Sequence, residues 1–290
     1  MKDVIIIGQG PAGLSAALYT CRAKLSTAIL GKGGSSLLKA EKIENYFGLK
    51  DPLSGQALLE IGKKQVTQLG AQWLEEEVLS IGFEEGCFLV DTQAQRYQAR
   101  SVILATGAPR KTIKIDGLSE FEGRGVSYCA VCDGFFFRNK AVAVLGNGPY
   151  ALHEAMELLP VAGSVTILTN GAAPSFDALP DGISLIQTPV QSLSGDGLLH
   201  KIHLADGKEL EMQGLFIALG SAGAADLARK LGAVVNGSAV AVDENMGTNI
   251  PGFFAAGDCT GGVLQVSVSV AEGAKAAMSA IDYVRHLPKA

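Results

Sequence analysis

Short apolar runs followed by glycine-rich turns divide this sequence into repeated units. Residues 4–7 (Val-Ile-Ile-Ile) lead into the glycine-rich residues 8–13, and residues 142–145 (Val-Ala-Val-Leu) lead into residues 146–151. A short apolar run bounded by turn residues is typical of a buried parallel strand, and the alanine- and leucine-rich stretch behind each turn is typical of a helix. The pattern predicts two copies of the strand, turn and helix that open a dinucleotide-binding fold.

Each copy is followed, later in the sequence, by a similar apolar segment that ends in glycine and is predicted to be a strand. These strands are predicted at residues 102–107 and 215–220. A third strand of the same kind, at residues 252–258, precedes an alanine-rich helix predicted from about Val266 to Tyr283. Because connections between elements are short and do not cross, we expect the third strand to return to the first domain.

The predicted fold class is therefore α/β, with two Rossmann-like domains of the three-layer ββα type that is found in FAD- and NAD(P)-binding proteins. The second domain is inserted in the first. The first domain is predicted to comprise residues 1–112 and 220–290, and the second residues 113–219. Such an insertion needs two chain crossings, which we expect near residues 111–114 and near Gly220.

Composition narrows the class of protein further. With 290 residues, of which 48% are apolar, the chain is long enough to bury two hydrophobic cores of moderate size. Its net charge is −5 and it has no long basic run, so the sequence does not indicate nucleic-acid binding. No apolar run approaches the roughly 20 residues that span a bilayer, and the N-terminus passes directly into a strand. Five cysteines, an odd number without an export signal, favour a reducing compartment. We expect a soluble cytoplasmic protein, with no membrane or nucleic-acid partner, in which any disulfide is catalytic.

The first glycine loop has the spacing of a pyrophosphate-binding turn. Glycine gives a tight turn at the first position, close approach of the backbone to an anion at the second, and close helix packing at the third. The acidic residue expected after the second strand is missing, so we expect backbone groups to meet the ribose there. The predicted cofactor-binding residues of this region are Gly8, Gly10, Pro11, Ala12, Gly13, Lys32 and Gly33. An ordinary turn between a strand and a helix is the alternative interpretation.

A cysteine pair lies just before the second unit. Cys129 and Cys132 are separated by two residues, a spacing that lets two thiols close a small, reducible disulfide at a helix N-terminus. A closed zinc site needs four ligands, and the sequence has no second pair near these cysteines, so no metal is expected. Asp133 is predicted either to exchange protons with the thiols or to cap a helix. Three further cysteines lack partners in the sequence and are predicted to be small buried apolar residues: Cys21, Cys87 and Cys259.

With these motifs in place, the sequence resembles the low-molecular-weight thioredoxin reductases over almost its whole length. The matching stretches are residues 8–13, 43–48, 105–108, 123–127, 129–134 and 250–258. The resemblance implies a bound FAD, with Asp258 reaching the ribityl chain, Gln265 near the pyrimidine end, Asn45 close to the isoalloxazine and Gly107 among the cofactor-binding residues. It also implies a homodimer, thioredoxin as partner, and a Cys132 that lies near the flavin in one conformation while the dithiol reaches thioredoxin in another.

The second glycine unit departs from the family pattern. Pro149 removes an amide donor, and Tyr150 is expected to add bulk beside the place of a pyrophosphate. Residues 169–174 (Thr-Asn-Gly-Ala-Ala-Pro) supply neither an arginine for the 2′-phosphate of NADPH nor an acid for the ribose of NADH. We therefore predict a redox-disulfide domain with a degenerate NADPH-binding-like fold, and no NADPH as cofactor. A variant pocket that uses other residues is the alternative.

This departure is similar to that of the ferredoxin-dependent flavin thioredoxin reductases, and residues 39–48 and 258–266 strengthen the resemblance. It implies reduced ferredoxin as electron donor. Transfer from a ferredoxin near about −400 mV to thioredoxin near about −270 mV is downhill by roughly 6 kcal/mol for two electrons. An acidic ferredoxin would need a basic docking patch on this chain, and the candidates are Arg110, Lys111, Lys114, Arg138 and Lys140.

Two other functions are compatible with the same motifs. A flavin dithiol oxidase would pass electrons from a small dithiol to dioxygen, although its second cysteine is commonly followed by His rather than by an acid such as Asp133. A non-catalytic flavoprotein would use the cysteines as a redox sensor. The retention of flavin loops and dithiol together favours the reductase.

Overall fold

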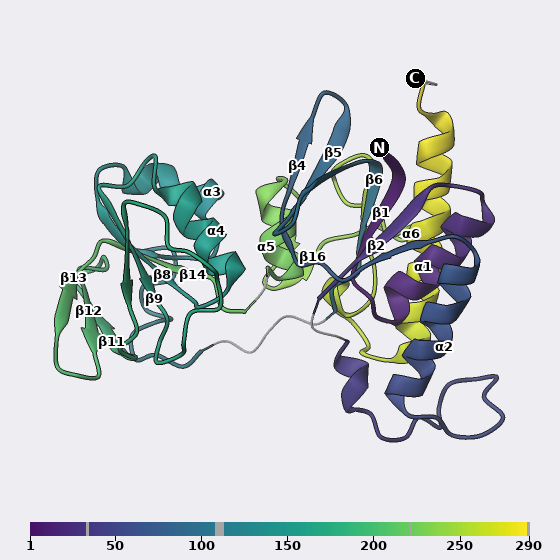
Figure 1. Ribbon diagram of the computed structural model, residues 1–290, viewed down its shortest axis with the longest axis horizontal. Helices are drawn as coiled ribbons and strands as arrows, with labels where there is room; N and C mark the ends of the chain where they lie inside the picture. The colour runs from purple at the N-terminus through teal and green to yellow at the C-terminus, as the bar shows by residue number, and fades with distance from the viewer. Residues whose placement is uncertain (33–34, 108–112, 221, 289–290) are drawn as a thin grey trace. The chain divides into compact units, whose positions relative to one another are not determined.

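The computed structural model describes residues 1–32, 35–107, 113–220 and 222–288 (Figure 1). The chain divides into two compact units: unit 1 comprises Met1–Arg110 and Gly223–Ala290, and unit 2 comprises Lys111–Ala222. These boundaries differ from the predicted ones by two or three residues at each crossing. Arg110 and Lys111 lie outside the described residues.

Unit 1 is built on a mainly parallel sheet. Its strands are β1 (Lys2–Ile7), β2 (Thr27–Leu30), β3 (Gln72–Leu74), β4 (Val78–Glu84), β5 (Cys87–Thr92), β6 (Arg96–Leu104) and β17 (Phe253–Ala255). Their order is β3-β2-β1-β6-β5-β4, and β17 pairs with β6 in parallel, which confirms the predicted return of the third strand to the first domain. The antiparallel hairpin β4-β5 joins the first half of β6, whereas β1 and β17 flank its second half. The long β6 therefore connects the parallel layer to the antiparallel one.

Helices cover the parallel strands of unit 1. They are α1 (Pro11–Arg22), α2 (Gly55–Gln68) and α6 (Val266–His286), with the shorter α5 (Ala224–Lys230), η1 (Ser36–Lys39) and η3 (Asp258–Thr260). In Figure 1, α1, α2 and α6 lie side by side. Small residues make this packing close: Ala16 of α1 and Ala276 of α6 are fully buried, and a Cβ at Gly273 would overlap the carbonyl oxygen of Ala12. A short hairpin, β15 (Val235–Asn236) and β16 (Ala239–Val240), completes the unit.

Unit 2 repeats the parallel arrangement. Its five-stranded sheet has the order β10-β9-β8-β14-β7, formed by β7 (Val126–Ser127), β8 (Ala141–Leu145), β9 (Ser164–Leu168), β10 (Ile183–Ile186) and β14 (Gly214–Ile217). The helical segments are α3 (Ala130–Asp133), η2 (Gly134–Phe137) and α4 (Pro149–Leu158). A separate antiparallel sheet contains β11 (Val190–Ser194), β12 (Lys201–Leu204) and β13 (Glu209–Glu211).

The two parallel sheets share one topology. The order β3-β2-β1-β6 in unit 1 corresponds to β10-β9-β8-β14 in unit 2, so each first strand lies between the second strand and a later one. This is the strand order of a Rossmann-type fold, in which ligands bind at the carboxyl ends of the strands where the order reverses. The α/β class and the two Rossmann-like units are as the sequence predicts, and each unit places a glycine loop at that edge.

Candidate active site

The first glycine loop is shaped by contacts that exclude side chains. Gly8 follows β1 with φ +124°, and a Cβ there would overlap the carbonyl oxygen of Ala105 at the end of β6. A Cβ at Gly13 would overlap the carbonyl oxygen of Gly8, so α1 begins directly against the turn. Gly10 is the N-cap residue of α1 in an extended conformation. The loop therefore requires glycine at the first and third positions of the fingerprint, Gly8 and Gly13, because a Cβ at either would overlap backbone atoms.

The start of α1 is open to an anion. Pro11 occupies the first helical position, and no side chain caps the helix in the described structure. The first N–H groups of a helix have no intrahelical partner, and its N-terminus carries a partial positive charge. Close by in the fold, beyond Ala105, Thr106 Oγ1 is buried without a hydrogen-bond partner among the described residues. Helix N–H groups that no side chain caps, together with a hydroxyl group that has no partner, are suited to bind an anionic group such as a pyrophosphate.

The segment after β17 lies against the same helix start. A Cβ at Gly257 would come within 2.8 Å of the Ala12 Cβ, and the Gly257 N–H donates to Glu272 Oε2 at 2.8 Å. Asp258 is half-buried and accepts a hydrogen bond from Ser269 Oγ at 3.1 Å. Glu272 of α6, which was not predicted from the sequence, thus holds in place the turn directly before Asp258.

Other predicted cofactor residues lie in unit 1 as well. Asn45 Nδ2 donates to Gln265 Oε1 at 3.0 Å, so the structure brings together two residues that are 220 positions apart. Gln265 is the N-cap residue of α6. Gly107 has φ +85° and Lys32 is exposed. Gly33 lies outside the described residues.

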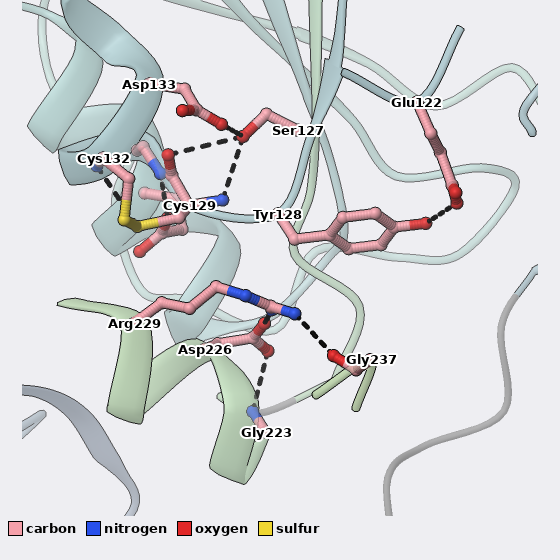
Figure 2. Close-up of polar contacts among 12 residues, drawn as sticks. Glu122, Ser127, Tyr128, Cys129, Cys132, Asp133, Gly223, Asp226, Arg229 and Gly237 are labelled. Atoms are coloured by element: carbon pink, nitrogen blue, oxygen red, sulfur yellow. Dashed lines mark hydrogen bonds and ion pairs between the residues drawn. A yellow bond between two sulfur atoms is a disulfide. The ribbon is translucent and has the colours of Figure 1, made fainter. Parts of the chain in front are cut away.

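The cysteine pair of unit 2 forms a disulfide at the start of α3. Cys129 is the N-cap residue, the Cα atoms of Cys129 and Cys132 are 5.3 Å apart, and the Cys132 N–H donates to Cys129 Sγ at 3.2 Å (Figure 2). Cys129 is buried and Cys132 is exposed. A disulfide at a helix start is a reducible group next to N–H donors that can stabilise a thiolate.

Asp133 is the N-cap residue of η2 by position, but its side chain makes no capping hydrogen bond, so the structure does not support the alternative in which the carboxyl group caps a helix. Asp133 is also the last residue of α3. Its Oδ2 instead accepts a hydrogen bond from Ser127 Oγ at 2.6 Å, and Ser127 Oγ also accepts from the Cys129 N–H at 3.1 Å (Figure 2). Ser127 therefore holds the carboxylate beside the cysteine pair.

A second acidic residue near the disulfide was not predicted. Glu154 of α4 is 1% exposed, and its Oε2 accepts a hydrogen bond from the Ala130 N–H at 2.9 Å. A signal was available in the sequence, because Ala151, Ala155 and Leu158 have helical spacing and place residue 154 on the same inward face. A charged residue on an apolar helix face marks a specific partner.

The second glycine loop corrects two expectations. Pro149 occupies the first position of α4 as Pro11 does in α1, so its missing N–H does not distinguish the two loops. Tyr150 is 1% exposed and forms part of the interior, as Ala12 does at the matching position. It does not obstruct the outer side of the loop, because the second residue of each helix faces inward.

What closes the second loop is the segment after β9. The backbone oxygen of Asn147 accepts hydrogen bonds from the Ser175 N–H at 2.7 Å and from Ser175 Oγ at 3.2 Å. Asn147 Nδ2 donates to the Ala173 oxygen at 2.9 Å. The Asn170 side chain is bonded to the Val190 N–H at 2.7 Å. The segment that would receive an adenosine ribose is thus bonded to the glycine loop itself.

The remaining cysteines differ in environment. Cys259 is fully buried, and desolvation raises its pKa to about 12. Cys21 and Cys87 are only half-buried, so the prediction of burial is wrong for them. Burial also raises the pKa of the Cys21 thiol. Among the described residues, no cluster of acidic, His and Cys side chains could hold a metal ion, and no helix has the length and apolar character to cross a membrane.

Comparison with known proteins agrees with this geometry. Residues 2–273 match the family of pyridine nucleotide-disulphide oxidoreductases. The thioredoxin reductase of Treponema pallidum (strain Nichols) is 39% identical over 97% of each chain. The structure of the atypical thioredoxin reductase TRi from Desulfovibrio vulgaris Hildenborough superposes with a TM-score of 0.94, at 41% identity over the whole of both chains. A ferredoxin-flavin thioredoxin reductase from Clostridium acetobutylicum gives a TM-score of 0.72, at 32% identity over 99% of both chains. The chain belongs to the pyridine nucleotide-disulphide oxidoreductase family and, within it, to the thioredoxin reductases.

Proposed function

We propose that this chain is a flavin-dependent thioredoxin reductase that receives electrons from reduced ferredoxin and passes them through the Cys129–Cys132 disulfide to thioredoxin. The observation that carries the proposal is that Asn147 of the second glycine loop is bonded to residues 173–175, whereas the buried Thr106 Oγ1 near the first loop has no hydrogen-bond partner among the described residues. One dinucleotide seat is retained, and it is the one in unit 1.

FAD fits the residues of unit 1. Gly8, Gly10, Pro11, Ala12 and Gly13 would seat its pyrophosphate at the start of α1, where the helix is uncapped. Further contacts are assigned to Asp258 for the ribityl chain, to the bonded pair Asn45 and Gln265 for the flavin ring, and to Lys32, Gly33 and Gly107 around them. When bound, FAD supplies the conversion between the single electrons of ferredoxin and the electron pair that a disulfide accepts.

Unit 2 offers a nicotinamide nucleotide little binding energy. A 2′-phosphate needs a cationic partner and a bare ribose an acidic one, but the segment after β9 supplies neither at Thr169, Asn170 or Gly171. The backbone oxygen of Asn147 and the side chain of Asn170 are already used within the protein. NADPH would have to break these hydrogen bonds before it could bind.

Ferredoxin is the donor that this arrangement favours. The Clostridium acetobutylicum protein, which is named a ferredoxin-flavin thioredoxin reductase, is similar over nearly the whole chain. Of the predicted basic patch, Lys114, Arg138 and Lys140 are exposed, and they would complement an acidic partner.

The chain's own residues account for thiol exchange. Ser127 orients Asp133, which can hold or release the proton of a neighbouring thiol as the disulfide opens and closes. Three exposed apolar side chains, Val131, Phe135 and Phe136, lie around Cys132 in the sequence. Exposed aromatic residues beside a reactive group are suited to a protein partner, and we assign this surface to thioredoxin.

The homodimer implied by the resemblance and the cytoplasmic location expected from the cysteine content remain predictions. Light scattering at micromolar concentration should give a mass of about twice the 30.1 kDa of one chain. A monomer mass would count against the dimer.

An anaerobic titration tests the electron donor. Reduced ferredoxin should bleach the bound flavin rapidly and drive thioredoxin reduction, whereas saturating NADPH or NADH should bleach it slowly or leave it unchanged. Rapid bleaching by NADPH at micromolar concentration would show an NADPH-dependent reductase with an unusual pocket. Reduction by a small dithiol, with dioxygen as the acceptor and no thioredoxin turnover, would show a dithiol oxidase.

A further inference from the structure

The carboxyl group of Glu154 is fixed at the start of the helix that carries the cysteine pair. The side chain comes from α4, is 1% exposed, and accepts the Ala130 N–H at 2.9 Å. Ala130 is the first residue of α3, so its N–H is one of the donors that a helix start leaves without an intrahelical partner. A buried acidic group is therefore bonded to the residue next to Cys129.

The start of α3 is also where a thiolate of the reduced pair would be stabilised. Cys129 Sγ accepts the Cys132 N–H at 3.2 Å, and N–H groups at a helix start favour an anionic sulfur. The carboxyl oxygen of Glu154 occupies a neighbouring donor of the same helix start, the Ala130 N–H. A second negative charge close to a buried carboxylate is disfavoured, so Glu154 opposes ionisation of the dithiol.

The strength of the Cys129–Cys132 pair as an electron donor depends on how stable its reduced, dithiol form is. A disulfide becomes a strong oxidant when its reduced form is stabilised, as happens when one thiol is held as a thiolate. A carboxylate that disfavours the thiolate has the opposite effect, and the dithiol is then the stronger reductant at equilibrium. We propose that Glu154 is a positioning residue that keeps the Cys129–Cys132 dithiol a strong electron donor by opposing thiolate formation at the start of α3.

The proposal rests on the proposed function only in taking this disulfide as the group that passes electrons on. In that exchange an ionised thiol of the pair attacks one sulfur of the partner's disulfide, a mixed disulfide forms, and the partner's other sulfur leaves as a thiolate. The second thiol then loses its proton and attacks the mixed disulfide. The Cys129–Cys132 bond re-forms, and the partner leaves as a dithiol with two electrons and two protons.

Other titratable groups near α3 are arranged differently. The helix packs against η2 and α4. Asp133 on α3 is bonded to Ser127, and His153 and Glu157 on α4 lie 3.9 Å from each other. Arg138, directly after η2, is exposed. Among the described residues, Glu154 is the acid whose oxygen accepts the Ala130 N–H.

The variant Glu154→Gln separates charge from hydrogen bonding, because the amide oxygen can accept the same N–H. The matched control is Glu157→Gln, an exposed acid one turn along α4.

Two properties of each flavin-loaded protein are measured. The pH dependence of alkylation of the reduced pair gives the thiol pKa, and equilibration with glutathione buffers gives the ratio of dithiol to disulfide. Alkylation should report a pKa lower by about one unit in Glu154→Gln. At about pH 8.5, the ordinary thiol pKa, the ratio should shift up to about tenfold toward dithiol, equivalent to roughly 30 mV.

The pH pattern distinguishes charge from structure. Near pH 6, where both thiols are protonated, Glu154→Gln and the unmodified protein should have the same ratio, and Glu157→Gln should match the unmodified protein throughout. An unchanged thiol pKa in Glu154→Gln, or a shift of equal size at both pH values, would overturn the proposal.

A second measurement covers the case in which Glu154→Gln does not fold. In protein labelled with 13C at glutamate carboxyl groups, ionising the reduced pair should change a carboxylate band in the infrared difference spectrum. Glu154→Asp keeps an acid but removes the label, so the band should disappear there and persist in Glu157→Gln. Absence of the band from the labelled unmodified protein, or its persistence in Glu154→Asp, would contradict the proposal. Neither measurement uses ferredoxin or thioredoxin, so a wrong electron donor and a wrong role for Glu154 give separate results.

Discussion

The two glycine loops of this chain have similar backbones and different surroundings. Gly10 and Gly148 are both extended N-cap residues, Pro11 and Pro149 both begin a helix, and neither helix start is capped by a side chain. In unit 1 the third glycine lets α1 begin directly against the turn, whereas Ala151 stands at the matching place in unit 2.

The difference that matters for binding lies outside the fingerprint. In unit 1, Thr106 Oγ1 is without a hydrogen-bond partner among the described residues. In unit 2, Asn147 bonds the glycine loop to Ala173 and Ser175. On the proposed function, a dinucleotide-binding unit keeps its strand, turn and helix and loses binding because a neighbouring segment uses the polar groups that a ligand would need.

The largest expected effect comes from replacing the cysteines of unit 2, which should remove thioredoxin reduction without removing the flavin. Replacing Cys129 or Cys132 by Ser should lower thioredoxin reduction by at least about 10³-fold, because no disulfide can form or exchange. Flavin content should be unchanged, since the proposed cofactor residues lie in unit 1. Steady-state turnover and the flavin absorbance per chain measure the two properties. Undiminished turnover in either variant would remove the disulfide from the proposed electron path.

The next prediction compares the cysteines of the two units. Desolvation raises the pKa of Cys259 in unit 1 to about 12, well above the value of about 8.5 for a free thiol. At pH 8 its thiolate fraction is about 10⁻⁴, so alkylation of the folded, reduced protein should be at least about 100-fold slower at Cys259 than at the exposed Cys132. Mass spectrometry of timed samples measures both rates. The same shift makes Cys259 reduce the stability of the fold as the pH rises above about 9, because the unfolded chain loses that proton first.

Matched substitutions in the two loops give a smaller effect. Gly10→Val should lower flavin content by about tenfold or more, because the side chain would occupy the place where the backbone approaches a pyrophosphate. Gly148→Val is the control, since both glycines have an extended backbone that valine can adopt. It should retain the flavin and keep ferredoxin-dependent turnover within about twofold. Equal flavin content in the two variants would show that the first loop is not the cofactor seat.

Much of this comparison could be predicted from sequence, because it depends on local patterns. The apolar runs and glycine spacing predict both βα units, and the two-residue spacer between Cys129 and Cys132 predicts the disulfide. Side-chain direction was harder to predict. Tyr150 was expected to protrude, but the second position of its helix faces the interior.

Features that depend on tertiary contacts were missed. The argument from Pro149 fails because Pro11 has the same position in the loop that we propose binds FAD. The bonds from Asn147 to residues 173–175 join segments about 26 positions apart, and no local pattern specifies them. Glu154 had a helical-spacing signal, but its partner at Ala130 depends on how α3 and α4 pack. Charged residues on apolar helix faces should therefore be examined as candidate site residues.

The smallest effect tests whether the third glycine or the bonded segment separates the two loops. Ala151→Gly restores the glycine fingerprint of unit 2, at a cost of about 1 kcal/mol for glycine in a helix, which urea denaturation can measure. Ala151 is fully buried, so loss of its methyl group adds to this cost. Because Asn147 remains bonded to Ala173 and Ser175, NADPH should still reduce the flavin no faster than in the unmodified protein. Stopped-flow absorbance at saturating NADPH gives this rate. A gain of tenfold or more, about 1.4 kcal/mol of barrier, would mean that the alanine methyl group, and not the closed segment, keeps nicotinamide nucleotides out.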